Sequence, residues 1–398
     1  MLTRAEVSNY KSIAAVDLNF EAENVIVGQN GVGKSNLLDA FHFMRDAIRD
    51  GLDQAITRRH GILSIRRWSK TRPYNISMKF CFKSPKGSGD YRFVIASGGG
   101  DFSVVEEEAH WFGPNPFVMT PRGEIAEKVH FRFGRSGNNK FHFDVPEDIF
   151  GKVGRPNISG SELLMTQFGQ SSPGPLGYFF QQLRDELSSF GAYSIYPNRI
   201  REPQTISNLE VLADDGSNLA SIVRQMRSTT FRASRDALTN AMRQVLPILT
   251  EIRIESAGGF YVPVFRVKET ESITGHDLNM SQISDGTLRM LGMIAAFYQP
   301  KSPSKIAIEE PEQMIHPGLL PILIDSARDY LDNRDRNRQV FITTHSPNLL
   351  DLFKPESVIG ATFENGVSKF SRLSSRQMAI IREGLYTPGE LMVVEGIA

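Results

Sequence analysis

The sequence predicts an α/β fold built around a phosphate-binding loop, and three observations support this prediction. An apolar strand pattern at 24–27 leads into the glycine-rich segment 28–35, and a helix pattern follows it. Strand and helix patterns then alternate between residues 286 and 352. A chain of 398 residues is also long enough to bury a large core and to form two lobes.

The segment 28–35 reads G-Q-N-G-V-G-K-S, which fits the pattern G-x-x-x-x-G-K-S. Its glycines are needed because backbone N–H groups must wrap the phosphates without a Cβ in the way. Lys34 would reach the β and γ oxygens, and Ser35 would offer its hydroxyl to Mg²⁺. The following helix points its N-terminus at the anion, so the chain is expected to bind a nucleoside triphosphate. The expected binding residues here are Asn30, Gly31, Val32, Gly33, Lys34, Ser35 and Asn36.

Composition limits the partners and the cellular compartments that we expect for this protein. Lys+Arg and Asp+Glu both number 45, so no net charge argues for nucleic acid or membrane as a partner. The single cysteine, Cys81, cannot form an internal disulfide and fits a reducing compartment. The N-terminus lacks the apolar run of a signal peptide, and the most apolar stretch, 290–298, is far below the roughly 20 residues of a membrane span. We expect a soluble cytoplasmic protein without a membrane partner.

The first half of the chain is predicted to be rich in strands. Apart from the loop strand and a helix at 36–47, strands are expected at 3–7, 16–20, 76–82, 91–96, 104–110, 130–133 and 141–145. The segment 170–175, Q-S-S-P-G-P, is expected to be a flexible turn.

The second half is predicted to be mostly helical at first and then alternating. Helices are expected from 176, at 218–226 and at 235–246, with a strand and loop at 192–203 and strands at 252–255 and 260–267. The last third is expected to run helix 286–298, strand 305–309, helix 317–331, strand 339–343, helix 346–352 and short strands at the tail. Sustained heptads are absent from the sequence, which excludes a long coiled-coil arm.

Paired carboxylates end the predicted strand 305–309, in the segment K-I-A-I-E-E-P-E. A buried strand that delivers acids at its C-terminal edge can manage a metal and an attacking water. Glu309 would contact Mg²⁺, and Glu310 would polarise the nucleophilic water. The alternative is an ordinary solvated strand end.

Two further polar clusters complete the set. In V-F-I-T-T-H-S-P, His345 follows a strand, where it would sense the γ-phosphate and hold the attacking water, or else be merely structural. In S-Q-I-S-D-G-T-L-R, Ser284 and Asp285 suit the start of a helix. The functional alternative is that Ser284, Asp285 and the Gly286 amide bind a γ-phosphate at this positive helix end.

These motifs occur in the order G-Q-N-G-V-G-K-S, S-D-G-T-L-R, I-E-E-P-E and T-T-H-S-P, and this order resembles the ABC-type ATPases of the RecF/SMC/OLD group, closest to their arm-less AAA_21-like members. An N-x-K-S motif (Asn9, Lys11, Ser12) near the N-terminus and a D-G-S-N-L-A segment at 215–220 add to the resemblance. It implies a P-loop ABC ATPase head that hydrolyses ATP, with a β-rich N-terminal lobe and an inserted helical lobe. The four motifs would be the Walker A loop, the signature, the Walker B strand with catalytic Glu310, and the switch His345.

The resemblance also implies domain boundaries, and the sequence departs from the family pattern at two points. The domains would be 1–100 with the Walker A loop, 101–250 as the inserted lobe, and 251–398 with the other motifs. Glu309 stands where most ABC enzymes carry Asp. A Q-loop glutamine is not assigned, although Gln167 and Gln170 are candidates by position.

The resemblance further implies a mechanism. The signature of one subunit would complete the nucleotide site of another, so two ATP molecules would lie in a head-to-tail dimer. Proteins of this type look like ATPases that control a partner effector, a nuclease or toxin, in bacterial anti-phage defence. The alternative is a RecF-like DNA repair ATPase that binds DNA directly. His316 and Pro317 would lie at the D-loop of the dimer interface, or would simply start a helix.

Three remaining features concern partners. One basic cluster comprises Arg58, Arg59, His60, Arg66, Arg67, Lys70 and Arg72, and a second comprises Arg224, Arg227, Arg232, Arg235 and Arg243. Either could contact a phosphate backbone, or be a solvated face with carboxylate partners. The sequence V-V-E-G at 393–396 resembles the opening strand of a Toprim nuclease, but more simply closes the ATPase head.

Overall fold

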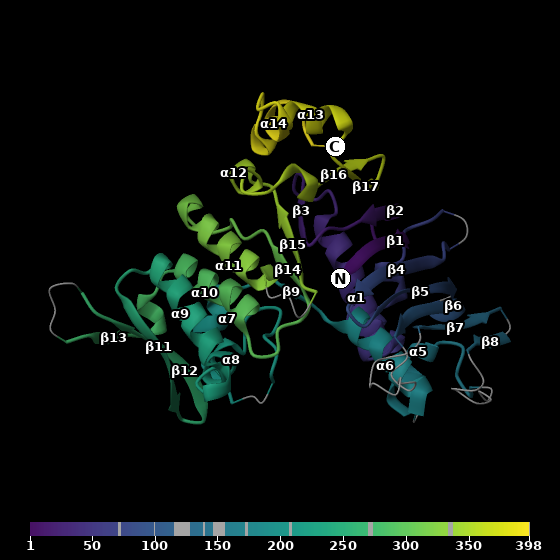
Figure 1. Cartoon of the computed structure of the whole chain (residues 1–398), viewed down its shortest axis with the longest axis horizontal. Coiled ribbons are helices and arrows are strands. Elements are labelled where there is room, and N and C mark those ends of the chain that lie inside the picture. The colour runs from purple at the N-terminus through teal and green to yellow at the C-terminus, as the bar shows by residue number, and fades with distance from the viewer. Residues whose placement is uncertain are drawn as a thin grey trace.

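The computed structural model describes residues 1–70, 73–98, 100–114, 128–137, 140–145, 156–171, 174–206, 209–269, 274–332 and 337–397. The predicted α/β fold is confirmed. Within these residues one large sheet runs through the molecule in the strand order β8-β7-β6-β5-β4-β1-β2-β17-β16-β3-β15-β14-β9. Figure 1 shows the strands from β4 to β8 forming a β-rich lobe at one end of this sheet, and a helical lobe beside the other end.

The sheet has an antiparallel and a parallel part. The antiparallel strands are β1 (Leu2–Tyr10), β2 (Ile13–Asn19), β4 (Ile76–Ser84), β5 (Gly87–Gly98), β6 (Asp101–Pro114), β7 (Lys128–Ser136) and β8 (Lys140–Asp144). The parallel strands are β3 (Glu23–Val27), β9 (Phe190–Tyr193), β14 (Lys305–Glu309), β15 (Gln339–Thr344) and β16 (Val358–Glu364). Because parallel strands end at one edge, β3, β14 and β15 bring their following residues together.

Both faces of the parallel part are covered, which is why β3, β14 and β15 each contain an unbroken apolar run. Along β3, Ile26 packs into one hydrophobic core, whereas Val25 and Val27 pack into the other. The same alternation places Phe341 of β15 on the first side and Ile342 on the second. Alternate residues of a strand point to opposite faces, so each strand is buried on both sides.

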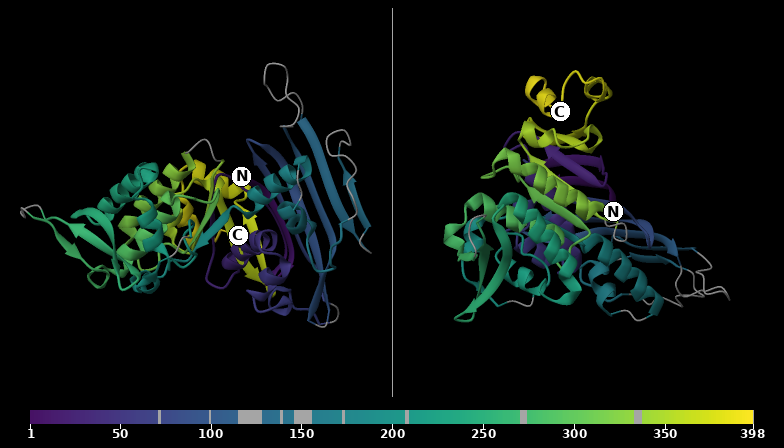
Figure 2. Two further views of the ribbon diagram at one scale, coloured as in Figure 1. Left: turned by 90° about the horizontal axis from the view of Figure 1, so that it is seen from below. Right: turned by 60° about the vertical axis from the view of Figure 1, so that its left-hand side comes forward.

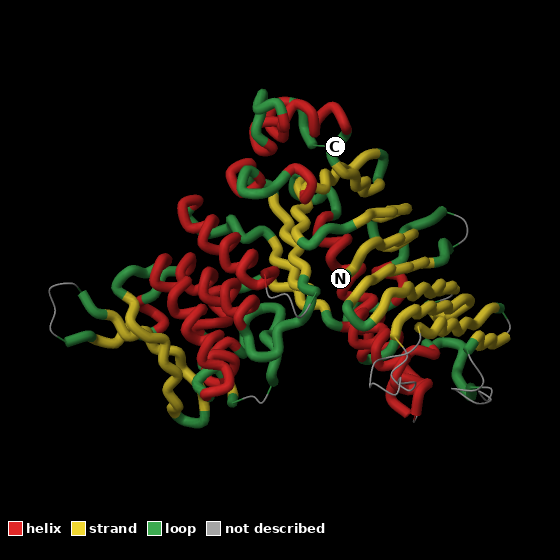
Figure 3. Tube along the Cα trace, in the orientation of Figure 1, coloured by secondary structure: helices red, strands yellow, loops and turns green. Residues whose placement is uncertain are grey.

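Each core has its own set of helices (Figures 2 and 3). The first is covered by α1 (Lys34–Arg49), α2 (Leu52–Thr57), α3 (Ile62–Ile65), α5 (Leu164–Ser171) and α6 (Gly174–Ser188). The second is covered by α7 (Pro197–Arg201), α8 (Leu219–Gln225), α9 (Arg232–Val245), α10 (Asp285–Tyr298), α11 (Leu320–Asp332) and α12 (Pro347–Leu350). Short 3-10 turns lie at η1 (Thr229–Phe231), η2 (Met280–Gln282), η3 (Pro317–Leu319) and η5 (Pro355–Ser357).

A second, smaller sheet lies at the outer side of the helical lobe. Its strands are β10 (Gln204–Thr205), β11 (Leu249–Ala257), β12 (Phe260–Val267) and β13 (His276–Leu278). The predicted division at residues 100 and 250 remains a proposal. The strands on either side of residue 100 pair in one sheet, and residue 250 lies within β11.

One prediction about local structure was wrong, and another is tested only in part. Of the segment 170–175, residues 170 and 171 end α5, residues 174 and 175 begin α6, and residues 172 and 173 lie outside the described residues. The tail contains β16 and β17 (Val367–Arg372) as expected, but it then forms α13 (Ser375–Arg382) and α14 (Pro388–Val394).

The V-V-E-G segment therefore ends a helix and does not open a Toprim-like strand. A capping box explains this helix, because the Thr387 hydroxyl accepts a hydrogen bond from the Glu390 N–H at 3.1 Å and the Glu390 carboxylate accepts one from the Thr387 N–H at 2.8 Å. Pro388 occupies the first helical turn, where its missing N–H costs nothing.

Candidate functional site

The phosphate-binding loop connects β3 to α1, as predicted. Gly31 and Gly33 have φ values of 79° and 103°, a region that favours glycine. A Cβ on Gly33 would lie 2.1 Å from the hydroxyl of Ser368. Asn30 and Gly31 are exposed at the loop tip, whereas Val32 is buried beneath it. The loop therefore presents its backbone at the edge of the sheet and is held from below.

Lys34 is buried under the loop with only 4% of its surface exposed. Its Nζ donates hydrogen bonds to the carbonyl oxygens of Gly28 at 2.8 Å and Gln29 at 3.0 Å. The same Nζ lies 3.5 Å from Oε1 of Glu310. The ammonium group thus stands between the loop backbone and the predicted catalytic carboxylate, a place suited to a γ-phosphate.

Asn36 and residues of the N-x-K-S motif form polar contacts that hold the start of α1 in place. The side-chain amide of Asn36 donates to the Ser12 hydroxyl at 2.7 Å, and that hydroxyl contacts the Ser368 hydroxyl at 2.6 Å. Lys11 pairs with Asp39 at 2.5 Å. Residues from both ends of the chain therefore fix the first turn of the helix that follows the phosphate loop.

Ser35 and Glu309 meet as the sequence predicts for a Mg²⁺ site. The Ser35 hydroxyl donates to Oε2 of Glu309 at 2.8 Å, across 274 residues of sequence. Burial raises the pKa of Glu309, and the Ser35 hydrogen bond opposes this shift. A hydroxyl and one carboxylate suit Mg²⁺, which keeps several positions for phosphate oxygens and water. In the described part of the chain, no group of three or more His, Cys, Asp or Glu side chains could hold a metal by itself.

Glu310 begins the turn after β14 with a φ of 41°, an unusual conformation for a non-glycine residue. Its N–H donates to the Thr343 carbonyl at 3.0 Å, and its carboxylate accepts a hydrogen bond from Gln313. His345 comes from the end of β15, and its Nδ1 lies 3.8 Å from Oε2 of Glu310. The structure thus brings Lys34, Glu310 and His345 together at one edge of the sheet.

The signature segment starts α10, as predicted. Ser284 is the N-cap, since its hydroxyl accepts a hydrogen bond from the Thr287 N–H at 3.2 Å. Asp285 forms an ion pair with Arg201, whose Nη2 also donates to the Ile283 carbonyl at 2.8 Å. Ser284 and Asp285 are exposed.

This signature turn is separate from the phosphate loop of its own chain. Among the described residues, no hydrogen bond or ion pair joins Ser284, Asp285 or Gly286 to residues 28–35. A Cβ on Gly286 would lie 2.8 Å from the Met314 carbonyl, so the turn packs closely on the segment after β14. The exposed side chains of Ser284 and Asp285 at the start of α10 therefore do not contact the local loop.

Sequence reasoning gave no role to Arg289 or Glu312, although both belong to quoted motifs. Arg289 is buried, and its Nη2 donates to the carbonyl oxygens of Glu310 at 3.0 Å and Glu309 at 3.4 Å. Burial lowers the pKa of Arg289. Glu312 accepts hydrogen bonds from the Thr344 hydroxyl and the His345 N–H. The roles of Arg289 and Glu312 depend on tertiary contacts. The only hint in the sequence is that both residues lie inside motifs.

Several other predicted residues lie elsewhere. The side chain of Gln167 donates to the Asn157 carbonyl at 2.8 Å and lines a cavity with residues 50–54, at the far end of α1 from the phosphate loop. Gln170 lies in α5, but its side chain is outside the described part. His316 caps η3 by accepting a hydrogen bond from the Gly318 N–H at 3.1 Å, which supports the helix-start interpretation.

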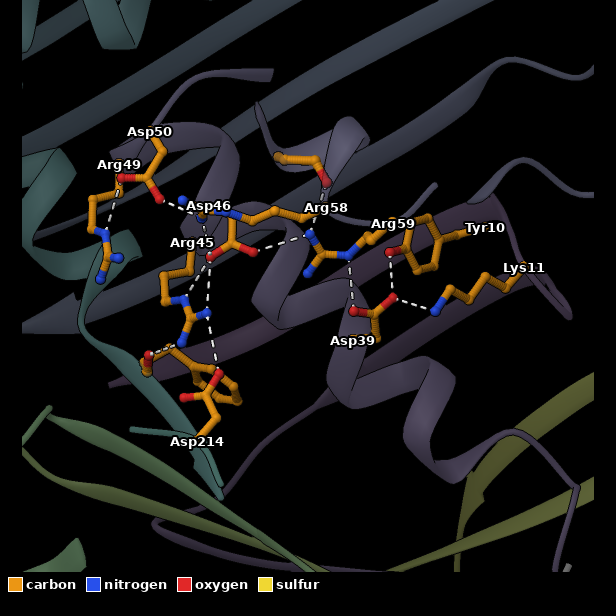
Figure 4. Close-up of polar contacts among 12 residues, drawn as sticks. Tyr10, Lys11, Asp39, Arg45, Asp46, Arg49, Asp50, Arg58, Arg59 and Asp214 are labelled. Carbon is orange, nitrogen blue, oxygen red and sulfur yellow. Dashed lines mark hydrogen bonds and ion pairs between the residues drawn. The ribbon is translucent and has the colours of Figure 1, made fainter. Parts of the chain in front are cut away.

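Two members of the first basic cluster, Arg58 and Arg59, are engaged in contacts within the chain (Figure 4). Arg58 pairs with Asp50 at 2.5 Å, and Arg59 pairs with Asp39 at 2.9 Å and with Asp46 at 3.0 Å. Burial opposes ionisation of Asp39, but Arg59 and then Lys11 outweigh it, so the pKa of Asp39 is lowered. These contacts favour the carboxylate-paired interpretation for Arg58 and Arg59.

The other basic residues also have mostly local contacts. Arg66 donates to the Ser97 hydroxyl at 2.8 Å, and the Arg67 guanidinium lies 5.6 Å from the Tyr74 ring centroid. In the second series, Arg224 lies over the Tyr261 ring, Arg232 and Arg235 pair with Asp236, and Arg243 donates to the carbonyls of Leu249 and Thr250. Arg72 lies outside the described residues.

Comparisons with known proteins agree with this geometry. Residues 24–351 match the AAA_21 family, described as "AAA domain, putative AbiEii toxin, Type IV TA system". A crystal structure of an Smc head bound to the C-winged helix domain of ScpA is similar in fold, with a TM-score of 0.53, 14% identity, and coverage of 95% of this chain and 99% of the other. The SMC head domain of Thermotoga maritima gives a TM-score of 0.43 at 12% identity, covering 94% and 99%.

Short matches to RecF complete the comparison. The DNA replication and repair protein RecF of Bacteroides fragilis is 51% identical over 45 residues, which are 11% of this chain and 12% of the relative. RecF of Porphyromonas gingivalis is 49% identical over a segment of the same length and coverage. The matched segment is thus a small part of the curated relatives.

The structure also contains, within its described part, no helix both long and apolar enough to cross a membrane. The expected resemblance to ABC-type ATPases of the RecF/SMC group is confirmed by the family match and by the shared fold. The chain belongs to the AAA_21 family of P-loop ATPase domains.

Proposed function

We propose that this chain is an ATP-binding and ATP-hydrolysing ABC-type switch that dimerises around two nucleotides and controls a partner effector in bacterial anti-phage defence. The contact between Ser35 and Glu309 is the main support for this proposal. It joins the phosphate loop to the Walker B strand through a hydroxyl and a carboxylate, two of the oxygen ligands that Mg²⁺ would take from the protein. When bound, Mg²⁺ would neutralise charge on the β- and γ-phosphates.

The chain's own residues would perform the remaining steps. Lys34 would bind the γ-phosphate, because its ammonium group lies buried beneath the loop. Glu310 would orient and polarise the attacking water, since its carboxylate lies 3.5 Å from Lys34 Nζ. His345 would hold the same water or the γ-phosphate from the neighbouring strand end.

The exposed signature turn supports the dimer. Ser284 and Gly286 lie at the N-terminus of α10, where the helix dipole favours an anion. Because no hydrogen bond or ion pair in the described residues links them to the local loop, their partner would be the nucleotide of a second copy. A two-fold head-to-tail arrangement satisfies both copies at once.

A mixing experiment tests this arrangement. Lys34→Ala should abolish nucleotide binding by the phosphate loop, and Ser284→Arg should block the signature turn. Each variant alone should therefore hydrolyse no ATP. Heterodimers of the two variants contain one site with an intact loop and an intact signature turn. ATPase activity should therefore return on mixing. Failure of the mixture to hydrolyse ATP, while wild type does, would contradict completion of the site in trans.

Control of an effector is supported by the family description, which includes a putative toxin of a Type IV toxin–antitoxin system. We place the protein in the cytoplasm, where ATP is abundant and the lone Cys81 stays reduced. Affinity purification of the tagged protein from its native host should recover a stoichiometric nuclease or toxin. Recovery of the chain alone, with and without ATP, would count against this part of the proposal.

A RecF-like role on DNA is the second candidate, supported by the short RecF matches. The internal pairing of Arg58 and Arg59 reduces the charge available to a phosphate backbone. Gel-shift titration over a range of salt concentrations separates the two functions. A DNA repair ATPase should bind duplex DNA by itself with steep salt dependence, whereas an effector switch should not.

A further inference from the structure

Glu312, the last residue of the I-E-E-P-E motif, contacts the segment that carries His345. One of its oxygens, Oε1, accepts hydrogen bonds from the Thr344 hydroxyl at 2.7 Å and from the His345 N–H at 2.9 Å. Only 9% of the Glu312 side chain is exposed. A buried carboxylate therefore holds the end of β15 at the point where the histidine leaves the strand.

Two polar atoms in this contact lack partners. The Nδ1 of His345 lies 3.2 Å from Oε1 of Glu312, but it makes no hydrogen bond within the described part of the chain. The other carboxylate oxygen, Oε2 of Glu312, is also buried without a hydrogen-bond partner there. Buried unpaired polar atoms are costly, so a small rotation of the imidazole that joins these two groups would be favourable.

We propose that Glu312 is a positioning residue that accepts the Nδ1–H of His345 and so fixes the tautomer of its ring. With the hydrogen held on Nδ1, the Nε2 atom carries the lone pair and would be the ring nitrogen that contacts the attacking water or the γ-phosphate. This inference rests on the proposed function, in which His345 holds the attacking water or the γ-phosphate. A carboxylate beside one ring nitrogen commonly sets the role of the other.

Glu310 is less suited to this task. Its Oε2 is 3.8 Å from Nδ1, beyond hydrogen-bond distance, and it already accepts a hydrogen bond from Gln313. Its other oxygen faces Lys34. Glu312, by contrast, is bonded to the main chain of His345 itself, so the carboxylate and the ring keep their relative position when the loop moves.

Imidazole ¹⁵N NMR tests this assignment directly. The ring signals of His345 are identified by their loss in His345→Asn. Wild type should show the Nδ1–H tautomer, and Glu312→Ala should change it to the Nε2–H form or to a mixture. Glu312→Gln retains an acceptor of the same shape and should keep more of the Nδ1–H form. Glu383→Gln, which alters an exposed glutamate at the C-cap of α13, is the control.

Steady-state kinetics supply the second measurement. Glu312→Ala should lower kcat by about 10- to 100-fold with KM for ATP changed less than about 2-fold, and Glu312→Gln should recover part of the loss. An unchanged tautomer in Glu312→Ala, or equal losses in kcat and in ATP affinity, would overturn the proposal. The NMR result does not require turnover, so an inactive wild type would refute the proposed ATPase function and still leave Glu312 testable. If Glu312→Ala fails to fold, the near-isosteric Glu312→Gln carries both measurements.

Discussion

Arg289 of the signature helix donates a hydrogen bond from Nη2 to the main-chain oxygen of Glu310 at 3.0 Å. The two residues belong to different motifs and are 21 positions apart in sequence. The arginine lies among carbonyl oxygens, since the same Nη2 is 3.4 Å from the Glu309 carbonyl. Through this contact, movement of the N-terminal part of α10 would be transmitted to the carboxylate that is proposed to activate water.

We expect Arg289→Met to slow ATP hydrolysis by about 10-fold while ATP affinity changes little, because the Glu310 main chain loses its charged donor from the signature helix. The loss of a charged donor to buried carbonyls should also cost roughly 1–3 kcal/mol of stability. Turnover assays and thermal melts measure the two effects. Arg227→Met, at an exposed position after α8, is the control. An unchanged kcat would show that this contact is only structural.

Lys34→Ala should abolish nucleotide binding, because the buried ammonium group is the only cation directly beneath the phosphate loop among the described contacts. Titration with a fluorescent ATP analogue measures the affinity. Lys301→Ala removes an exposed lysine and should leave the affinity at the wild-type value. Binding by Lys34→Ala with wild-type affinity would refute the assignment of the loop.

Glu310→Gln should keep ATP binding but slow hydrolysis by at least ~10²-fold, since the amide cannot polarise water as the carboxylate does. Slow hydrolysis should trap the ATP-bound dimer. Size-exclusion chromatography with light scattering should then report a stable dimer with ATP and a smaller species with ADP. If the variant turns over normally, another group is the catalytic base.

His42 should make the protein sensitive to acid. Burial, and then the charge of Arg45, lower the pKa of His42 to about 3, whereas an unfolded histidine titrates near 6.5. The unfolded state therefore gains a proton as the pH falls below about 6.5, while the folded state does not, so stability is lost progressively down to about pH 3. The expected loss is on the order of a few kcal/mol.

Replacement of His42 by phenylalanine tests this expectation. The ring of His42 packs edge-on against Phe190 at a centroid distance of 5.4 Å, so an aromatic side chain fits the site. Denaturant unfolding between pH 7 and pH 4 should show a flatter stability profile for His42→Phe than for wild type. His276→Gln, at an exposed position of β13, should keep the wild-type slope. Identical slopes for all three proteins would contradict the buried neutral histidine.

The sequence was sufficient to predict the elements that carry the motifs. The strand predicted at 305–309 has those bounds in the structure, because its apolar run is buried on both faces and bounded by polar residues. The convergence of Ser35, Glu309 and His345 follows from the shared edge of parallel strands. Their chemical roles stay predictions, since geometry alone does not measure turnover.

The features that were not predicted depend on tertiary contacts, or on local sequence patterns that favour two different structures. Arg289 and Glu312 act on main-chain atoms of other elements, and no periodic pattern encodes such a contact. The helix α14 was not predicted because V-V is typical of strands, although the capping box from Thr387 to Glu390 outweighs this tendency. Of the segment predicted as a turn at 170–175, the described residues belong to the end of α5 and the start of α6, where proline is tolerated in the first helical turn.

Strand β3, which leads into the phosphate loop, pairs on one side with β15 and on the other with β16. Both neighbours come from the last sixty residues of the chain, and the Ala361 carbonyl closes so tightly on Gly28 that a Cβ there would lie 2.4 Å away. During synthesis on the ribosome, β3 therefore lacks both of its strand partners until β15 and β16 have been made. The phosphate loop can take its final place only after that point, so nucleotide cannot stabilise the shorter nascent chains.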